Sequence, residues 1–212
     1  MIIGLCGHAR SGKNTVARII CELRPNTREL ALAAPIKEFC KQVFGWTDEH
    51  VGGDLKEVPD PDWGVVPRVA QQTLGTEWGR TLHEDVWLRL GLRRAQALLD
   101  EVRIVPKFPD DPAASSSVIQ TCDMVVITDI RFVNEARAIN ALGGQVWRVN
   151  PGQRLARSLS GAAAAHASEA EQFSDEMTAE CTLEIVNDGT LERLREMLAE
   201  VLASARTGMA GA

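Results

Sequence analysis

The chain has 212 residues and a mass of 23.1 kDa, which at about 150 residues per domain predicts one domain with insertions. Apolar residues make up 45% and charged residues 25%, a composition that is typical of a globular protein and excludes disorder as the main state. Acidic residues outnumber basic ones by 29 to 23 and give a net charge of −6, which argues against a protein that coats nucleic acid through its phosphates.

The first part of the chain has the pattern of a buried strand followed by a helix. Residues 2–6 form a short apolar run, as in strands that are covered on both faces. A glycine-bounded loop over 7–12 leads to a helix over 14–23, where apolar residues recur at helical spacing. A second strand is predicted over 30–33, and Pro35 is placed to open the next helix.

The middle of the chain is predicted to leave the core and return to it. Residues 47–66 are polar and acidic and contain paired glycines and two prolines, and helices are predicted over 67–79 and 82–102. Prolines and a triple serine mark 103–121 as a loop.

Strands and helices alternate again in the last part. Strands are predicted over 124–129, 145–149 and 182–186, helices over 134–142 and 191–203, and a lid over 150–167. This alternation predicts an α/β fold in which a mostly parallel sheet carries helices on both faces.

The cysteines and the hydropathy restrict the expected compartment. Five cysteines, at 6, 21, 40, 122 and 181, are odd in number and widely spaced, which argues against a disulfide framework or a zinc site. We expect no membrane partner, because no run reaches the roughly 20 apolar residues of a spanning helix. A signal peptide is also not expected, because the first strand runs directly into a motif. The expected location is a reducing cytoplasm.

The loop over residues 7–15 predicts phosphate binding. It reads Gly-His-Ala-Arg-Ser-Gly-Lys-Asn-Thr, in which Gly7, Gly12 and Lys13 fit the G-x-x-x-x-G-K pattern. Backbone N–H groups of such a loop converge on a phosphate, the following helix adds its dipole, and the lysine reaches the outer phosphates. Arg10 either touches a phosphate or faces water, and a plain strand–turn–helix connection is the alternative for the whole loop.

The loop departs from the usual metal-binding pattern, because Asn14 stands where Ser or Thr commonly binds Mg²⁺. Either Thr15 contacts the metal, or Mg²⁺ is held by water and other groups. Asp129 ends a predicted strand, where ligands of open α/β sheets bind. It is a candidate for the metal or the acceptor, and a helix cap or turn is its structural alternative.

Several charged residues beyond these strands are candidates for an anionic ligand. Arg131 would point at such a ligand and Glu135 could pair with it, with a surface ion pair as the alternative. Arg154 and Arg157 lie in the predicted lid, where they contact a ligand or water.

Six short blocks follow one another along the chain: 7–15, 32–37 (Leu-Ala-Ala-Pro-Ile-Lys), Arg68 with 72–77 (Gln-Thr-Leu-Gly-Thr-Glu), 129–135 (Asp-Ile-Arg-Phe-Val-Asn-Glu), 166–169 (His-Ala-Ser-Glu) and 187–191 (Asn-Asp-Gly-Thr-Leu). In this order they resemble phage deoxynucleoside monophosphate kinases. Each block alone is a weak signal, but the set spans most of the chain. Asn or Asp commonly precedes the Thr of the loop in that family, so Asn14 fits the resemblance.

The resemblance implies a single P-loop NTPase domain similar to nucleoside monophosphate kinases, with ATP and Mg²⁺. It implies acceptor helices within about 47–102, with the loop over 103–121 and the lid over 150–167 as further insertions. The ATP-binding residues would be Gly7, Arg10, Ser11, Gly12, Lys13, Asn14 and Thr15. The acceptor would meet Lys37, Arg68, Gln72, Asp129, Arg131 and Glu135. The catalytic residues would be Lys13, Asp129 and Arg131. The metal ligands would be Thr15 and Asp129.

Residue chemistry suggests how these groups would act on an acceptor. The amide of Gln72 has both a donor and an acceptor for a base edge. Arg68 and Arg131 could grip the acceptor phosphate in bidentate fashion.

Three functions stay open. The first is transfer of the ATP γ-phosphate to a deoxynucleoside monophosphate. The second is phosphorylation of 5-hydroxymethyluracil within DNA, as in similar phage kinases, with Asp129 as the base and the arginines at 89, 93 and 94 as a backbone contact. The third is a non-catalytic nucleotide switch, although the chain lacks the Asn-Lys-x-Asp block of a GTPase. A homodimer is left open.

Overall fold

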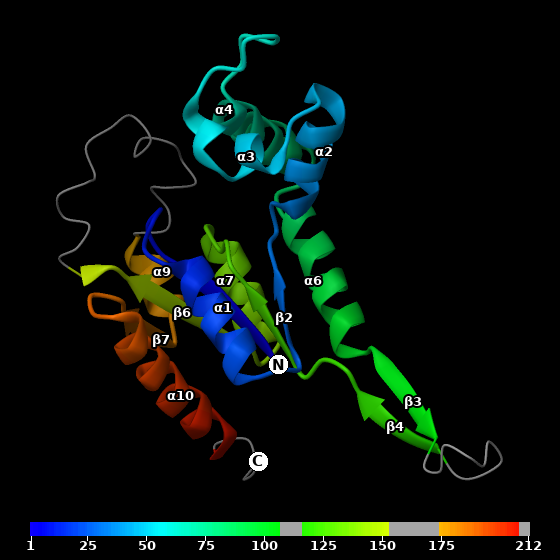
Figure 1. Cartoon of the computed structure of the whole chain (residues 1–212), viewed down its shortest axis with the longest axis vertical. Helices are drawn as coiled ribbons and strands as arrows, with labels where there is room; N and C mark the ends of the chain where they lie inside the picture. Colours follow the sequence, from blue (N-terminus) through cyan, green and yellow to red (C-terminus); the bar gives the residue numbers. More distant parts are fainter. Residues whose placement is uncertain (107–115, 153–173, 208–212) are drawn as a thin grey trace. The chain divides into compact units, whose positions relative to one another are not determined.

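The computed structural model describes residues 1–106, 116–152 and 174–207 (Figure 1). The chain forms two compact units: Met1–Leu30 together with Arg94–Ala212, and Ala31–Arg93. The bounds of the second unit differ from those of the insertion predicted at about 47–102, and the role of that insertion in acceptor binding stays a prediction. Arg154, Arg157 and the 166–169 block, like most of the predicted lid, lie outside the described residues.

The first unit is built on a five-stranded sheet. Its strands are β1 (Ile2–Cys6), β2 (Thr27–Leu30), β5 (Met124–Ile127), β6 (Gln145–Asn150) and β7 (Leu183–Val186), in the order β2-β5-β1-β6-β7. Every neighbouring pair is parallel, which confirms the predicted α/β class. Because parallel strands point the same way, all five carboxyl ends lie at one edge of the sheet.

Helices cover both faces of this sheet (Figure 1). On one face, α1 (Lys13–Leu23) and α10 (Leu191–Thr207) pack with the sheet into the main apolar core, which includes Ile3, Leu5, Ile20, Trp147 and Leu198. The opposite face carries α7 (Val133–Ala141) and α9 (Asp175–Glu180). Among the described residues, no helix combines the length and the apolar character that crossing a membrane requires.

The alternation of side chains along β1 decides which helix each residue meets. Ile3 and Leu5 belong to the core under α1 and α10, while a Cβ added to Gly4 would meet Ile139 of α7 at 2.7 Å. Since successive residues of a strand point to opposite faces, Cys6 lies on the same face as Gly4, toward α7 and α9.

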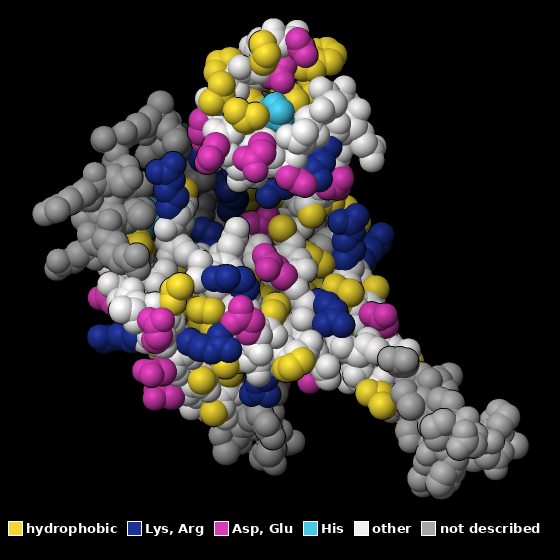
Figure 2. Space-filling model, in the orientation of Figure 1, with side chains coloured by type: hydrophobic (Ala, Val, Ile, Leu, Met, Phe, Trp, Pro, Cys, Tyr) yellow, Lys and Arg dark blue, Asp and Glu magenta, His cyan; other side chains and the backbone are white. Residues whose placement is uncertain are grey.

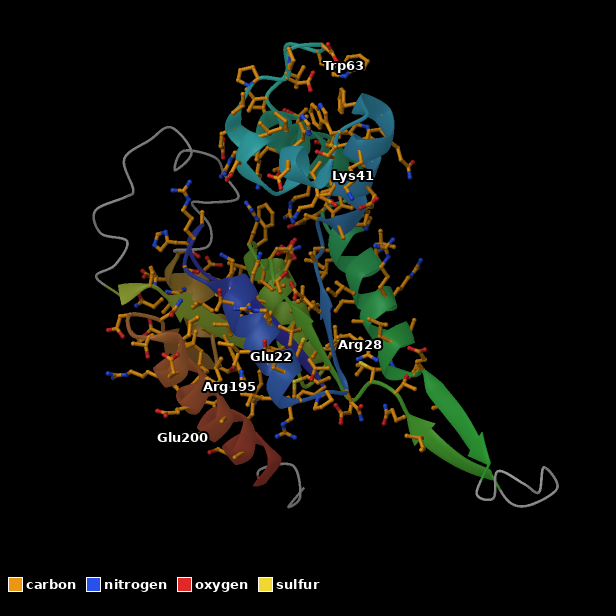
Figure 3. The ribbon with its side chains drawn as sticks, in the orientation of Figure 1. Glu22, Arg28, Lys41, Trp63, Arg195 and Glu200 are labelled. Carbon is orange, nitrogen blue, oxygen red and sulfur yellow. The ribbon has the colours of Figure 1, made fainter. Side chains whose placement is uncertain are left out.

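Ion pairs join the two helices on each face at their exposed sides. Glu22 of α1 and Arg195 of α10 point toward one another (Figure 3) and form an ion pair. On the opposite face, Arg137 of α7 bonds Glu180 of α9 at 3.0 Å. Exposed pairs contribute about 0–1 kcal/mol each, so the buried apolar faces supply most of the stabilisation.

A hairpin stands where the sequence predicts a loop. After α6 (Val86–Leu99), β3 (Val102–Pro106) and β4 (Ser116–Gln120) pair antiparallel, so the prediction of a loop over all of 103–121 is wrong at both its ends. The prolines and serines of this segment are typical of a loop. The Val and Ile residues near its two ends, however, favour strands. Similarly, β2 ends at Leu30, earlier than the predicted 30–33, because the second unit begins at Ala31.

The second unit is helical. It contains α2 (Ala34–Phe44), α3 (Asp48–Val51), the 3-10 helix η1 (Asp54–Glu57), α4 (Pro67–Gln72), a π-helical segment η2 (Thr73–Gly79) and α5 (Arg80–Leu82). Its core consists of Ile36, Cys40, Trp46, Val51 and Ala70. The helix predicted over 67–79 is therefore confirmed as helical backbone, with a change of pitch at Thr73.

A buried carboxylate organises the acidic stretch over 47–66. Asp60 accepts a hydrogen bond from the Trp46 indole at 3.0 Å and from the backbone N–H groups of Asp62 and Trp63, both at 3.0 Å. Burial raises the pKa of Asp60, but the bonds from Trp63, Trp46 and Asp62 outweigh it and lower that pKa below its ordinary value. This polar stretch thus has an internal anchor that its composition conceals.

Two leucines of α10 test where the stability of the first unit originates. Leu198 is fully buried in the core, whereas Leu191 is 56% exposed. We expect Leu198→Ala to lower the free energy of unfolding by about 2–5 kcal/mol, and Leu191→Ala to change it by less than about 0.5 kcal/mol. Urea denaturation measures both, and equal losses would contradict the packing described.

Candidate nucleotide-binding site

The loop between β1 and α1 has the backbone of an anion-binding turn. Gly7, Arg10 and Gly12 adopt positive φ angles of 135°, 63° and 99°. The Ser11 N–H donates to the His8 carbonyl at 3.2 Å and closes the turn between them. Left-handed residues within such a loop orient successive N–H groups into a concavity suited to an anion.

Close neighbours explain why glycine stands at both ends of the loop. A Cβ on Gly7 would lie 2.4 Å from the carbonyl oxygen of Val149 in β6, and one on Gly12 would lie 2.2 Å from the Asn187 amide nitrogen. Any side chain would therefore displace the loop from its neighbours, in addition to the cost of its φ angle.

Lys13 lies over this loop. It is the first residue of α1, and its Nζ donates to the carbonyl oxygens of Gly7 at 2.6 Å and of His8 at 2.7 Å. The ammonium group is thereby held beside the loop backbone and next to the positive end of the α1 dipole. This is where a phosphate chain bound by the loop would need a cation.

Ser11 provides a further polar group inside the loop. It is only 1% exposed, and its Oγ has no hydrogen-bond partner within the described part of the chain. A buried hydroxyl without a partner costs about 1–3 kcal/mol, which a bound phosphate oxygen would recover. The loop therefore fits the phosphate chain of ATP.

Thr15 and Asp129 offer oxygen ligands that fit Mg²⁺. Both side chains are half-buried, whereas Asn14 is exposed. The Ile130 N–H donates to the Leu5 carbonyl at 3.1 Å, which places Asp129 beside the end of β1. No cluster of three His, Cys, Asp or Glu side chains occurs among the described residues, but Mg²⁺ commonly takes one or two carboxylates and completes its shell with phosphate and water.

Asn187 is a residue of the site that the sequence predictions name only within the 187–191 block and not as a binding residue. It follows β7 directly, and its Nδ2 donates to the Ser11 carbonyl at 2.9 Å. Its backbone N–H donates to Asn150 at 2.7 Å. Its place just beyond a strand end, at the edge where the loop is predicted, was the signal that could have identified it.

Glu135 is engaged with the backbone that follows β5. Its Oε2 accepts from the N–H of Arg131 at 2.8 Å and from the N–H of Phe132 at 3.1 Å. Phe132 is the residue that precedes α7, so the carboxylate caps the start of this helix. Glu135 thus contacts the Arg131 backbone, and the predicted pairing of their side chains stays a prediction.

The other predicted acceptor residues lie in the second unit. Lys37 is half-buried in α2, and Gln72 is the last residue of α4, next to the π-helical segment. Arg68 donates to Glu57 at 2.8 Å. We predicted that these three residues bind the same acceptor as Asp129 and Arg131. This stays a prediction.

The chain resembles known proteins in sequence and in fold, although no family model matches it. A protein of Acanthamoeba polyphaga mimivirus, provisionally named a deoxynucleotide monophosphate kinase, is 32% identical over 155 residues, covering 71% of this chain and 74% of that protein. The crystal structure of TT1252 from Thermus thermophilus has a TM-score of 0.50 at 20% identity, covering 96% of this chain and 97% of that one. Shikimate kinase from Aquifex aeolicus has a TM-score of 0.47 at 11% identity and covers all of both chains. The parallel sheet with its phosphate-type loop between β1 and α1 is a P-loop NTPase fold, as predicted.

The contact of Asn187 with the loop can be tested directly. Asn187→Ala removes the amide that holds the Ser11 carbonyl, a loss of about 0.5–1.5 kcal/mol. If this contact orders the loop, the Kd for ATP rises by roughly 2- to 13-fold. Isothermal titration calorimetry measures it. Asn26→Ala, in an exposed turn, is the control, and an equal effect there would contradict the assignment.

Proposed function

Because this chain belongs to the deoxynucleotide monophosphate kinase family, we propose that it transfers the γ-phosphate of ATP to a deoxynucleoside monophosphate and forms the diphosphate. The chain is a P-loop kinase, and family membership follows from the 32% identity to the mimivirus protein. The observation that carries the proposal is Lys13, held 2.6 Å from the Gly7 carbonyl over a loop of positive-φ residues.

The proposed reaction needs positioning more than acid–base chemistry. A phosphate oxygen of the acceptor attacks the γ-phosphorus, and the bond from that phosphorus to the ADP oxygen breaks. The acceptor oxygen is already ionised near neutral pH, so no strong base is required. Alignment of the two phosphates and neutralisation of their charge carry the rate.

The residues of the first unit divide this task. The loop N–H groups and Lys13 bind and neutralise the donor phosphates, and Arg131 neutralises the acceptor phosphate. Thr15 and Asp129 would hold Mg²⁺, which when bound supplies further charge neutralisation on the phosphates. Glu135 acts through the Arg131 backbone, which it holds at 2.8 Å, and so serves as a positioning residue.

The second unit would supply the contacts that select the acceptor. Gln72 presents an amide suited to a base edge. The Arg68 side chain is only 16% exposed and its guanidinium forms an ion pair with Glu57, so its position is restricted before a ligand binds. Lys37 adds a second positive charge from α2. An amide and two cations are the groups that a base edge and a phosphate require.

DNA containing 5-hydroxymethyluracil is the second candidate acceptor, and the surface of α6 favours it. Arg89, Arg93 and Arg94 are all exposed on this helix, where they could contact a phosphate backbone. Against this, the face drawn in Figure 2 shows Lys and Arg interspersed with Asp and Glu and not gathered into one basic surface. A hydroxyl acceptor would also need a base, for which Asp129 is the candidate.

Replacing the loop lysine tests the phosphoryl-transfer site. We expect Lys13→Ala to lower kcat at least about 100-fold, as does removal of one preorganised transition-state donor in other enzymes, with unchanged circular dichroism. Lys41→Ala is the matched control, because Lys41 forms ion pairs with the exposed Glu38 and Asp48. Turnover in Lys13→Ala equal to that of the unaltered chain would exclude the loop as the donor site.

The acceptor is identified by measuring ATP consumption with each candidate. The assay compares the four deoxynucleoside monophosphates and 5-hydroxymethyl-dUMP with DNA that contains 5-hydroxymethyluracil. Turnover with a free monophosphate supports the proposal, and turnover with DNA alone overturns it in favour of the second candidate. ATP binding without any turnover would indicate the nucleotide switch.

The two acceptor chemistries also predict different outcomes for two variants. With a monophosphate acceptor, Gln72→Ala raises the KM for the acceptor about 2- to 13-fold through one lost hydrogen bond and leaves the KM for ATP unchanged. With a hydroxyl acceptor, Asp129→Asn loses the base as well as a metal contact, so excess Mg²⁺ does not restore its kcat, whereas with a monophosphate acceptor it does. Steady-state kinetics of both variants over a range of Mg²⁺ concentrations decides between them.

A further inference from the structure

Two thiols meet directly beneath the phosphate-binding loop. Cys6 is the last residue of β1, is fully buried, and precedes Gly7. Cys181 follows α9 and is half-buried. Their Sγ atoms are 3.5 Å apart although the residues are 175 positions apart in the chain. Such a separation is short enough for a disulfide to form by a small movement, since an S–S bond measures about 2.05 Å.

A guanidinium group lies beside this pair. Arg148 of β6 is the register partner of Cys6, and Glu184 of β7 is the register partner of Arg148, so the three residues form a row across one face of the sheet. The hydrogen bond from Cys6 and the charge of Arg148 lower the pKa of Cys181 to about 7, against burial and the charge of Glu184. The bond to Cys181 and burial raise the pKa of Cys6.

The other cysteines have no such surroundings. Burial raises the pKa of both Cys21 and Cys40. Cys122 is buried, and its thiol donates to the Met124 carbonyl at 3.2 Å. Cys181 likewise donates to the Met177 carbonyl at 3.2 Å, but it differs from Cys122 in having both a thiol and the Arg148 charge beside it. A thiolate is the reactive form of cysteine, so Cys181 is the thiol that an oxidant would attack first.

We propose that Cys181 and Cys6 form a peroxide-oxidisable pair, in which Cys181 is oxidised first and Cys6 then converts it to a disulfide that weakens nucleotide binding. In the first step the Cys181 thiolate attacks hydrogen peroxide. An S–O bond forms, the O–O bond breaks, and the departing hydroxide combines with the proton that Cys181 released on ionisation, giving water. In the second step the Cys6 sulfur attacks Cys181. An S–S bond forms, the S–O bond breaks, and the leaving hydroxide takes the Cys6 proton. The two thiols are oxidised by two electrons, and the peroxide is reduced to two waters.

The position of Cys6 couples this disulfide to the loop. The adjacent Gly7 already lies against the Val149 carbonyl, where a Cβ would come within 2.4 Å. The Gly7 carbonyl also receives the Lys13 ammonium at 2.6 Å. Movement of Cys6 toward Cys181 therefore displaces the residue on which both contacts depend, and the loop loses its anion-binding arrangement.

The test treats the reduced chain with hydrogen peroxide and then measures cross-linking and ATP affinity. Peptide mass spectrometry is expected to find a Cys6–Cys181 disulfide, and the rate of its formation is expected to rise with pH through about 7. The Kd for ATP is expected to rise at least about tenfold and to return after reduction by dithiothreitol. Cys181→Ser is expected to keep the untreated affinity and to be insensitive to peroxide, whereas Cys21→Ser responds as the unaltered chain does.

Each result decides the proposal. The proposal is overturned if no Cys6–Cys181 cross-link forms, or if the cross-link leaves the ATP affinity unchanged. It is also overturned if Cys181→Ser loses ATP affinity after peroxide treatment as much as the unaltered chain does. Cross-linking and ATP affinity can be measured whatever the acceptor is. Only a loss of turnover on oxidation would depend on the proposed function. A chain that cross-links and loses ATP affinity, but phosphorylates no deoxynucleotide, would support the thiol pair and contradict the proposed acceptor.

Discussion

The close approach of the loop over residues 7–12 to its neighbours is the constraint on which the site depends. The Val149 carbonyl lies against Gly7, and the Asn187 amide lies against Gly12 and bonds the Ser11 carbonyl at 2.9 Å. These contacts come from strand β6 and from the residue after β7, which are far from the loop in the chain. The loop is thereby held from outside in a backbone conformation that leaves its N–H groups available to an anion.

The parallel sheet brings the remaining groups of the first unit to the same edge. Asp129 follows β5, Asn187 follows β7 and the loop follows β1, so the strand direction alone places all three at the carboxyl edge. Rigid strands then limit how far each group moves, which suits phosphoryl transfer, where alignment and charge neutralisation supply most of the rate. The same arrangement puts Cys6 directly before Gly7, the first residue of the loop. A movement of Cys6 on oxidation would therefore shift Gly7 through the peptide bond that joins them.

The accuracy of the sequence predictions follows the range of the interactions involved. The loop, its lysine and the strand before them depend on neighbours within a few residues, and they were predicted correctly as structure. The hairpin at Val102–Pro106 and Ser116–Gln120 was missed, because each strand is stabilised by a partner that nine residues, rich in turn formers, separate from it in the sequence. The buried anchor at Asp60 was missed for a similar reason, since its partner Trp46 lies 14 residues earlier.

The sequence by itself determined the fold class and the phosphate-binding loop, because apolar periodicity and glycine spacing are local properties that tertiary contacts seldom override. Only the tertiary structure decided the contacts of the side chains. It placed Asn187 on the Ser11 carbonyl, Glu135 on the backbone of Arg131, and Cys6 within 3.5 Å of Cys181. Each of these depends on the helix caps and strand register that form when the sheet is assembled, and residue spacing along the chain does not encode such distances.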